Sequence, residues 1–410
     1  MVPGVECART GISLEEDSQM KTLPSRELCC GCTACSAICP KGAIKMIPDN
    51  EGFSQPVVDE SVCVNCLACE RVCPVLNQGA QRQPLACYVA KSLNDDERMK
   101  SSSGGIFSVF AWRILAEGGK VYGVAWKKDP FRAAHVGVES VDGLTDLRGS
   151  KYVQSEMGST YREVRADLQS GRKVLFTGCP CQIAGLRSFL GKDYENLITQ
   201  EVICNSVPSP RVFEAWVRSE QKKAPGEELL NVNFRDKSVG WHNATLKFTF
   251  TTTTTTTTNM QLSAYYRLWQ RGYSVRRSCI ECGFRDFKSG ADLTIGDFWG
   301  IEAERPECDD NKGVSTILAN TDRGAKFLND VKSELLIDSV SYASVVKKNP
   351  CLHKSFDLLK TAGKRRDEFW TKINAGADVQ KIGMKMTKDP LRVRIRLWGG
   401  RILRKWGLRK

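Results

Sequence analysis

The chain has 410 residues with 18 cysteines, and its formal net charge is +13. Disulfide scaffolds are usually short secreted chains, and the first residues contain no apolar segment suited to a signal peptide. We therefore expect a cytoplasmic protein whose cysteines are metal ligands or free thiols. The longest apolar stretch, residues 105–116, contains an arginine and is shorter than the roughly 20 residues of a membrane-spanning helix, which argues against a transmembrane segment.

Two runs of four cysteines near the start of the chain share the spacing C-x2-C-x2-C-x3-C-P and lie 34 residues apart. This repeat is the bacterial ferredoxin pattern, in which three cysteines of one run and the fourth of the other bind each 4Fe-4S cluster. Zinc ribbons use two C-x-x-C knuckles instead, so zinc is the weaker alternative. Cys30, an extra thiol in the first run, is expected to be a bystander. The pattern assigns one cluster to Cys29, Cys32, Cys35 and Cys73, and the other to Cys63, Cys66, Cys69 and Cys39.

The segment between the two runs, residues 43–59, alternates apolar and polar residues around a turn at residues 49–52, which predicts a β-hairpin. After a polar connector, strands alternate with helices, which indicates a largely parallel α/β sheet whose ligands lie at the carboxyl ends of the strands. A serine- and glycine-rich turn, residues 101–105, precedes an apolar helix. Such a turn suits a phosphate or pyrophosphate, although a simple helix cap is the more common explanation.

Four more cysteines lie at predicted turns of this larger region, which is enough for a third 4Fe-4S cluster. Two buried thiols with a zinc knuckle, or no metal at all, remain alternatives, and the spacing alone does not choose among them. These cysteines are Cys181, Cys204, Cys279 and Cys282.

Seven motifs follow the two cysteine runs in a fixed order. They are SSSGGIFS, GGKVYGVAW, RGSKYVQS, TGCPCQIAGLRSFL, VPSPRVFEAW, SCIECGFRDFKSGADLTIGDFWG and KGVSTILANT. Together they resemble the coenzyme F-420 hydrogenase/dehydrogenase beta-subunit family, over residues 26–369. The resemblance implies an iron-sulfur flavoprotein that binds FAD and exchanges electrons with a soluble acceptor, which is coenzyme F-420 in the archaeal enzymes.

Carried over position by position, the resemblance also implies site residues. Lys151 and Asp297 are expected at the reaction centre, and the four additional cysteines match family cysteines suited to a cluster near the flavin. Cys179 occupies a position that is usually not cysteine, so it is an alternative ligand to Cys181, which we favour. Residues 205–206 are Asn-Ser where the family commonly has His-Gly, which puts a proton-transfer role there in doubt. The residues expected at the flavin are Ser103, Gly104, Gly105, Ser150, Lys151, Tyr152 and Gln182.

These expectations define four segments. An α+β ferredoxin-like domain with two 4Fe-4S clusters spans residues 24–78, and a connector spans 79–86. A larger α/β domain that binds FAD and a third cluster spans 87–370, and a basic tail spans 371–410. The expected function is an FAD-dependent iron-sulfur oxidoreductase acting on coenzyme F-420 or another small metabolite. The alternative is a non-catalytic electron-transfer subunit of a larger hydrogenase or dehydrogenase complex.

The expected partners are a ferredoxin-like or other redox protein and a small-molecule electron acceptor or donor. Residues 385–410 hold ten lysines and arginines against one aspartate, together with two tryptophans. Such a tail can contact the inner face of a membrane or an acidic partner, or it can simply aid solubility. We expect no nucleic-acid partner. The eight threonines at residues 251–258 are expected to end a strand and enter a hairpin loop.

Overall fold

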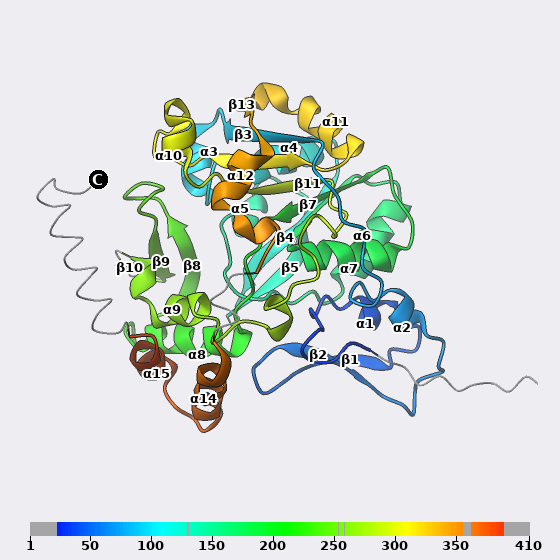
Figure 1. Ribbon diagram of the computed structural model, residues 1–410, viewed down its shortest axis with the longest axis vertical. Helices are drawn as coiled ribbons and strands as arrows, with labels where there is room; N and C mark the ends of the chain where they lie inside the picture. Colours follow the sequence, from blue (N-terminus) through cyan, green and yellow to red (C-terminus); the bar gives the residue numbers. More distant parts are fainter. Residues whose placement is uncertain (1–22, 129–130, 253, 258, 356–361, 389–410) are drawn as a thin grey trace, which may run out of the picture.

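The computed structural model describes residues 23–128, 131–252, 254–257, 259–355 and 362–388 (Figure 1). The region that carries the two cysteine runs is a small α+β unit. Its antiparallel hairpin turns where predicted, because the Asp49 carboxylate accepts hydrogen bonds from the backbone N–H groups of Glu51 and Phe53, at 2.8 and 3.0 Å. The elements of this unit are α1 (Ala34–Ile38), β1 (Ile44–Pro48), β2 (Ser54–Val58) and α2 (Ala68–Arg71).

An eight-stranded sheet forms the centre of the larger region. Its four middle strands, β11, β7, β6 and β4, are parallel, and the pairs outside them are antiparallel. The expected largely parallel sheet is therefore a mixed sheet. The order across it is β13 (Leu335–Ser339), β3 (Ala86–Ser92), β12 (Ser315–Ala319), β11 (Leu293–Asp297), β7 (Leu197–Val202), β6 (Val174–Gly178), β4 (Lys120–Lys127) and β5 (Arg132–Val138).

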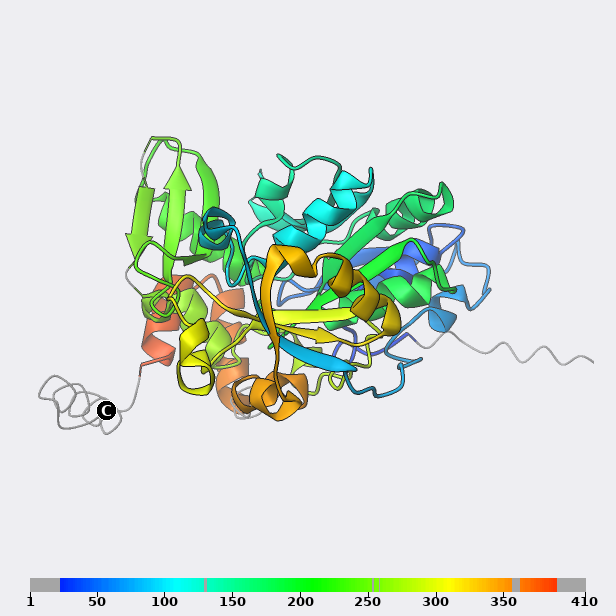
Figure 2. The same cartoon turned by 90° about the horizontal axis from the view of Figure 1, so that it is seen from above.

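Helices cover both faces of this sheet (Figure 2). On one face α4 (Ile106–Ala116) and α11 (Asp322–Asp330) bury apolar side chains, among them Phe110 and Phe327, against the strands. On the other face α6 (Thr160–Gln169) and α7 (Pro180–Leu190) share a core with α1. The remaining helices around the sheet are α3 (Asp95–Lys100), α5 (Leu144–Leu147), α10 (Ile301–Glu304) and α12 (Tyr342–Lys348).

A second sheet of three antiparallel strands stands beside the first and packs on four helices. Trp216 and Tyr265 stack in its core, with ring centroids 4.8 Å apart. Its threonine-rich strand forms the outer edge, so part of the threonine run is a strand rather than a loop. The elements are β8 (Leu229–Asp236), β9 (Thr245–Phe250), β10 (Thr254–Thr257), α8 (Pro210–Gln221), α9 (Ala264–Gln270), α14 (Gly363–Asn374) and α15 (Val379–Met386).

The C-terminal helices continue the core past the expected domain end at residue 370. That boundary falls inside α14, and Ile373, Val379 and Met386 are buried in the same cluster as Trp216. Residues up to Met386 therefore belong to the folded body, which includes the first part of the expected tail. The membrane or partner role expected of the tail lies mostly outside the described residues, at 389–410.

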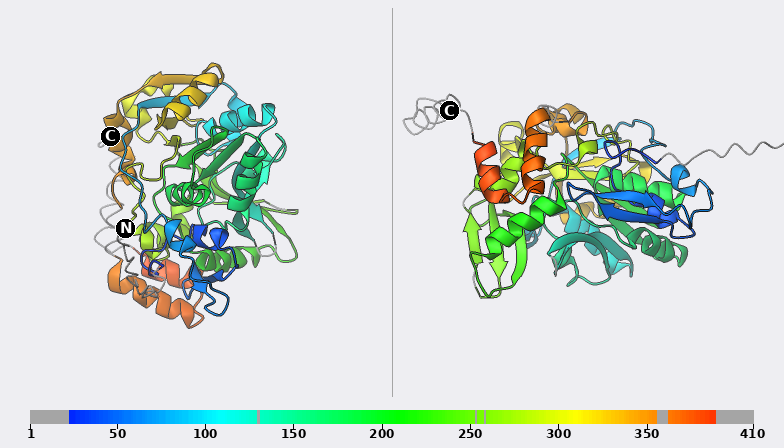
Figure 3. Two further views of the ribbon diagram at one scale, coloured as in Figure 1. Left: turned by 90° about the vertical axis from the view of Figure 1, so that its right-hand side faces the viewer. Right: turned by 90° about the horizontal axis from the view of Figure 1, so that it is seen from below.

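The cysteine-run region lies against the rest of the chain (Figure 3), and two buried charged groups fasten it there. Glu51, which is 2% exposed, forms ion pairs with Arg26, Arg277 and the α14 residue Arg366. Arg276, which is 1% exposed, donates hydrogen bonds to the backbone oxygens of Cys29 and Ser54, at 2.7 and 3.0 Å. Because an unpaired buried charge is costly, these contacts hold the region in one position.

Gly185 gives the first cysteine run close access to α7. A Cβ atom placed at this glycine would lie 2.8 Å from the Cβ of Cys32 and 2.8 Å from the hydroxyl of Tyr161. Such distances are shorter than van der Waals contact, so only glycine lets the helix approach the cysteine loop this closely. The position lies inside a regular helix with no φ strain, so the missing side chain serves packing alone.

We expect Gly185→Ala to destabilise the protein by about 1–3 kcal/mol through overpacking, although alanine is the better helix former by about 1 kcal/mol. Thermal unfolding under anaerobic conditions and iron content measure the effect. Ser188→Ala, in the same helix, is the control and should change little. An increase in stability for Gly185→Ala would show that helix propensity dominates and that the contact with Cys32 is unimportant.

Candidate redox centres and cofactor cavity

The two cysteine runs have the same backbone shape as well as the same spacing. In each run the residues on both sides of the second cysteine adopt left-handed φ angles: Gly31 (68°) and Thr33 (70°) in the first, Asn65 (50°) and Leu67 (55°) in the second. Non-glycine residues adopt this conformation at a cost that the surrounding structure must offset. The same pair of left-handed residues therefore shapes both cysteine loops in the same way.

One set of four cysteines lines a small cavity near the surface of the cysteine-run region. Cys66 is exposed and Cys63 is half-buried, while Cys69 is buried. The cavity joins three cysteines of the second run to the last of the first, as the ferredoxin pattern predicts. Its cysteines are Cys39, Cys63, Cys66 and Cys69, and we call this set the outer site.

The other set, which we call the inner site, faces the larger region and comprises Cys29, Cys32, Cys35 and Cys73. Burial, together with the neighbouring thiols Cys29 and Cys73, raises the pKa of Cys35 to about 12. Burial also raises the pKa values of Cys29 and Cys73. Thiols bind metal as thiolates, and a bound metal removes the cost of the buried charge. The donor set therefore fits an iron-sulfur cluster.

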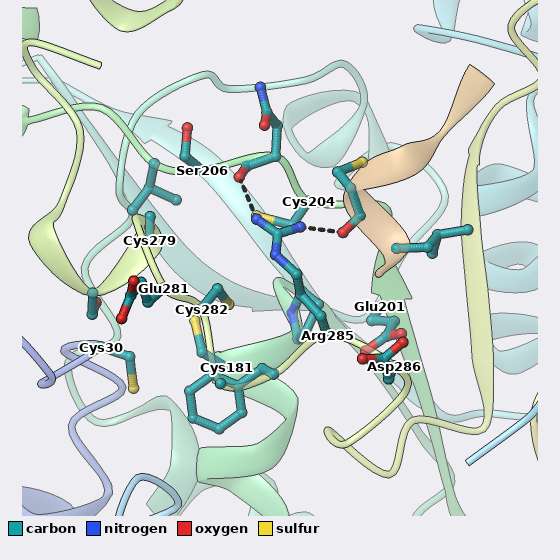
Figure 4. Close-up of a pocket in the computed structure, with 18 of the residues that line it drawn as sticks. Cys30, Cys181, Glu201, Cys204, Ser206, Cys279, Glu281, Cys282, Arg285 and Asp286 are labelled. Carbon is teal, nitrogen blue, oxygen red and sulfur yellow. Dashed lines mark hydrogen bonds between the residues drawn. The ribbon is translucent and has the colours of Figure 1, made fainter. Parts of the chain in front are cut away.

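The four further cysteines of the sequence meet at a second buried place (Figure 4). Cys181 belongs to the first turn of α7, Cys204 follows β7, and Cys279 and Cys282 come from the loop before β11. They line one cavity of about 90 Å³, which we call the cysteine cavity. Burial raises the pKa of Cys279 to about 12, so this thiol too would ionise only with a cation bound. A set of four convergent thiols fits a 4Fe-4S cluster.

Cys179 and Cys30 take positions that spacing did not reveal. Cys179 hydrogen-bonds to the Cys204 thiol and lies near Cys279 and Cys282, whereas Cys181 lines the cysteine cavity and bonds to Cys30, so both thiols belong to this group of cysteines and the choice of Cys181 stays a prediction. Cys30 lines the cysteine cavity, and its thiol hydrogen-bonds to those of Cys181 and Cys32. Expected to be a bystander, Cys30 instead lies between the inner site and the cysteine cavity. Its place next to Cys29 in the sequence is the only signal that could have indicated this.

A second cavity of about 470 Å³ opens beside the cysteine cavity, and we call it the large cavity. It lies at the carboxyl ends of β6, β7 and β11, where an α/β sheet binds its ligands. Its volume is within the range of small-molecule and cofactor sites. The two cavities share part of their walls, including Cys181, Cys204, residues 202–203, residues 205–207 and Cys351.

Most residues expected at the flavin line the large cavity. These are Ser103, Gly105, Ser150, Lys151, Tyr152 and Gln182. Gly104 is the exception: its backbone N–H donates to the Ser315 hydroxyl at 2.9 Å and is not free for a phosphate. The first N–H groups of α4, from Ile106, have no partner within the helix and lie beside it. The serine turn therefore presents the helix N-terminus rather than the N–H group of Gly104.

Gln182 directs much of its side chain toward protein groups. Its Oε1 accepts from the backbone N–H of Cys179 at 2.9 Å, which caps α7, and its Nε2 donates to the Ser155 hydroxyl at 3.0 Å. Ser155 in turn hydrogen-bonds to Nδ1 of His135, whose pKa burial lowers to about 4. This chain of hydrogen bonds keeps a neutral histidine behind the cavity wall.

The two residues expected at the reaction centre, Lys151 and Asp297, also line the large cavity. Nζ of Lys151 donates to the backbone oxygens of Asp146 and Arg148, at 2.8 and 2.6 Å, and burial lowers its pKa to about 7. Asp297 accepts from Nε1 of Trp241 at 3.3 Å and forms an ion pair with the β8 residue Arg235, also at 3.3 Å. Both charged ends are thus bonded to protein groups.

The fold and these sites define a protein with thiolate-lined redox centres next to a cofactor-sized cavity. Residues 28–77 match the model of the 4Fe-4S dicluster domain, and residues 171–344 match that of the C terminus of the coenzyme F420 hydrogenase/dehydrogenase beta subunit. The chain therefore joins a region of the two-cluster 4Fe-4S type to a region similar to the C terminus of that beta subunit. The resemblance predicted from the sequence motifs is confirmed.

Among solved structures, a chain of the F420-reducing [NiFe] hydrogenase complex from Methanosarcina barkeri is similar. The identity is 16%, the match covers 72% of this chain and 92% of that one, and the TM-score is 0.45. No curated protein sequence matches the chain. No helix among the described residues is both long and apolar enough to cross a membrane.

Proposed function

We propose that the protein is an FAD-dependent iron-sulfur oxidoreductase that exchanges electrons between a redox partner protein and a small soluble molecule, coenzyme F-420 or another metabolite. The observation that carries the proposal is the wall shared by the cysteine cavity and the large cavity, at Cys181 and Cys204. A cluster and a flavin bound there would be neighbours. When bound, the flavin supplies the exchange between one-electron and two-electron chemistry.

In this proposal the cysteines form a path into the protein. The outer site, with Cys66 exposed, is where a ferredoxin-like partner approaches. The inner site packs on α7 through Cys32, and Cys30 connects it to the cysteine cavity. Cys181, Cys204, Cys279 and Cys282 are the proposed ligands of a third 4Fe-4S cluster at that point.

Lys151 and Asp297 act in the proposal through the groups they hold. Lys151 fixes the end of α5 by its bonds to two backbone oxygens and so positions Ser150 beside the serine turn. Asp297 orients Arg235. The residues proposed to face the flavin are those expected from the resemblance that also line the large cavity. Gly104 does not line it but allows close backbone packing, since a Cβ there would lie 2.7 Å from the Ala90 oxygen.

Iron, acid-labile sulfide and flavin per chain, measured on anaerobically purified protein, test the proposal. About twelve irons with one FAD are expected for three 4Fe-4S clusters and a flavin. About eight irons with no flavin would contradict it and would indicate a non-catalytic electron-transfer subunit. Turnover of a soluble acceptor by the isolated chain then separates an enzyme from a subunit that works only within a larger complex.

A further inference from the structure

One charged side chain in the wall of the large cavity has hydrogen-bond donors that the described residues do not use. Arg235 of β8 is 8% exposed. Asp297 and the Tyr152 side chain lie next to its guanidinium, but its Nε and Nη2 make no hydrogen bond of good geometry with the described residues. Its guanidinium lies over the indole ring of Trp299, 4.9 Å from the centroid, and Trp299 also lines the cavity. Leaving buried donors without partners is costly, which indicates that a ligand completes their hydrogen bonding.

The sheet register places Arg235 next to the serine turn. Asp297, its ion-pair partner, lies directly opposite Ser315 in the β11–β12 pair, and the hydroxyl of Ser315 accepts the N–H of Gly104. Residues 101–103 and the first residues of α4 line the same part of the cavity. A helix of eleven residues presents a partial positive charge and free N–H groups at this end. The guanidinium and the helix start therefore belong to one wall.

A second cation close in sequence fixes this arrangement. Lys237 directly follows the end of β8, two residues after Arg235, and it is 3% exposed. Its Nζ donates to the backbone oxygens of Ser103 and Lys312, both at 2.7 Å, and to that of Arg98. The ammonium group of Lys237 thus holds the serine turn in place, and its three donors are all bonded to backbone oxygens. Among the described cations that line the large cavity, Arg235 is the buried one whose side chain has unused donors, and Lys348 lines the cavity as an exposed cation.

We propose that Arg235, the serine turn of residues 101–103 and the start of α4 form a subsite for an oxyanion of the phosphate class. A guanidinium suits such a group because its planar donors bind two oxygens at once. The oxyanion can be the diphosphate of the flavin dinucleotide, in which case the inference rests on the proposed function. It can also be a phosphate group of the small-molecule partner. The sequence signal that could have found the site is a pair of cations at positions 235 and 237, at the end of a strand that carries buried apolar residues.

The test uses the full chain, purified anaerobically and freed of flavin, titrated with FAD and with riboflavin, which lacks phosphate. Arg235→Gln should weaken FAD binding by about 10- to 100-fold and leave riboflavin binding unchanged. Arg235→Lys keeps the charge and should fall between, and it replaces the glutamine variant if that variant does not fold. Arg218→Gln is the control, because Arg218 is 70% exposed on α8. Circular dichroism and iron content confirm that each variant is folded.

Inorganic pyrophosphate distinguishes the two sources of the oxyanion. If the flavin diphosphate fills the subsite, pyrophosphate competes with FAD for the wild-type protein. If a substrate group fills it, pyrophosphate binds to the FAD-loaded protein, and Arg235→Gln abolishes that binding. The inference is wrong if Arg235→Gln changes neither FAD nor pyrophosphate affinity. A wild-type chain that binds no flavin at all would overturn the proposed function alone, since the pyrophosphate titration still decides the subsite.

Discussion

We expect replacement of Cys279 and Cys282 by alanine to lower the iron content by about four atoms per chain, because the proposed third 4Fe-4S cluster would lose two of its four thiolates. The eight cysteines of the inner and outer sites belong to another part of the fold, so about eight irons should stay. Iron and sulfide analysis measures the loss, and low-temperature electron paramagnetic resonance of the reduced protein should show one cluster signal fewer.

Cys308→Ala is the matched control for this experiment. Cys308 is a half-buried thiol that lines neither the cysteine cavity nor the large cavity, so its loss should leave the iron content unchanged. Twelve irons retained in the double variant would exclude Cys279 and Cys282 as ligands. A wild-type protein with about eight irons would exclude the third cluster itself.

Replacing Glu51 by glutamine should destabilise the protein by about 3–5 kcal/mol, because the buried Arg366 then keeps its charge without a counter-charge. Arg366 is 3% exposed, and its remaining partners are the backbone oxygens of Gly272 and Tyr273, at 3.0 and 2.9 Å. Anaerobic urea unfolding, followed by circular dichroism, measures the difference. Cluster content should fall in parallel, since the hairpin that carries Glu51 is part of the cysteine-run region.

Two further variants show whether the buried pair explains the effect. Glu51→Gln combined with Arg366→Met should recover much of the lost stability, since removing both charges is far less costly than removing one. Glu214→Gln breaks the exposed pair with Arg218 and should cost less than about 1 kcal/mol. If Glu51→Gln were as stable as the wild-type protein, the ion pairs of Glu51 would not hold the region in place.

The iron-sulfur runs could be predicted from sequence because their chemistry is local. Four cysteines within eleven residues set the shape of one loop, and the repeat identifies the exchange of the last ligand between Cys39 and Cys73. The hairpin between the runs was predictable for the same reason, since its turn is stabilised by Asp49 within the segment itself.

The cysteine cavity was not predictable from spacing. Its four cysteines span a hundred residues of sequence and come from the ends of separate strands and loops. Their place at predicted turns made a third cluster conceivable, but the spacing could not choose among a cluster, zinc and no metal. Strand direction was also hidden: β12 reads as one more buried strand, and its antiparallel pairing with β11 depends on where the intervening loop returns. The sequence did not predict a binding role for Arg235, because that role is inferred from side-chain donors that remain unpaired in the folded protein.

The pairing of Glu51 with Arg366 joins positions 315 residues apart. During synthesis the cysteine-run region leaves the ribosome first, and domains generally fold in that order. Its contacts with the rest of the protein are complete only when α14, which carries Arg366, has emerged near the end of translation. Contacts with α7 and Arg276 can form earlier, so the ion pair with Arg366 is the last of these attachments to become available, and cluster insertion into the inner and outer sites can precede it.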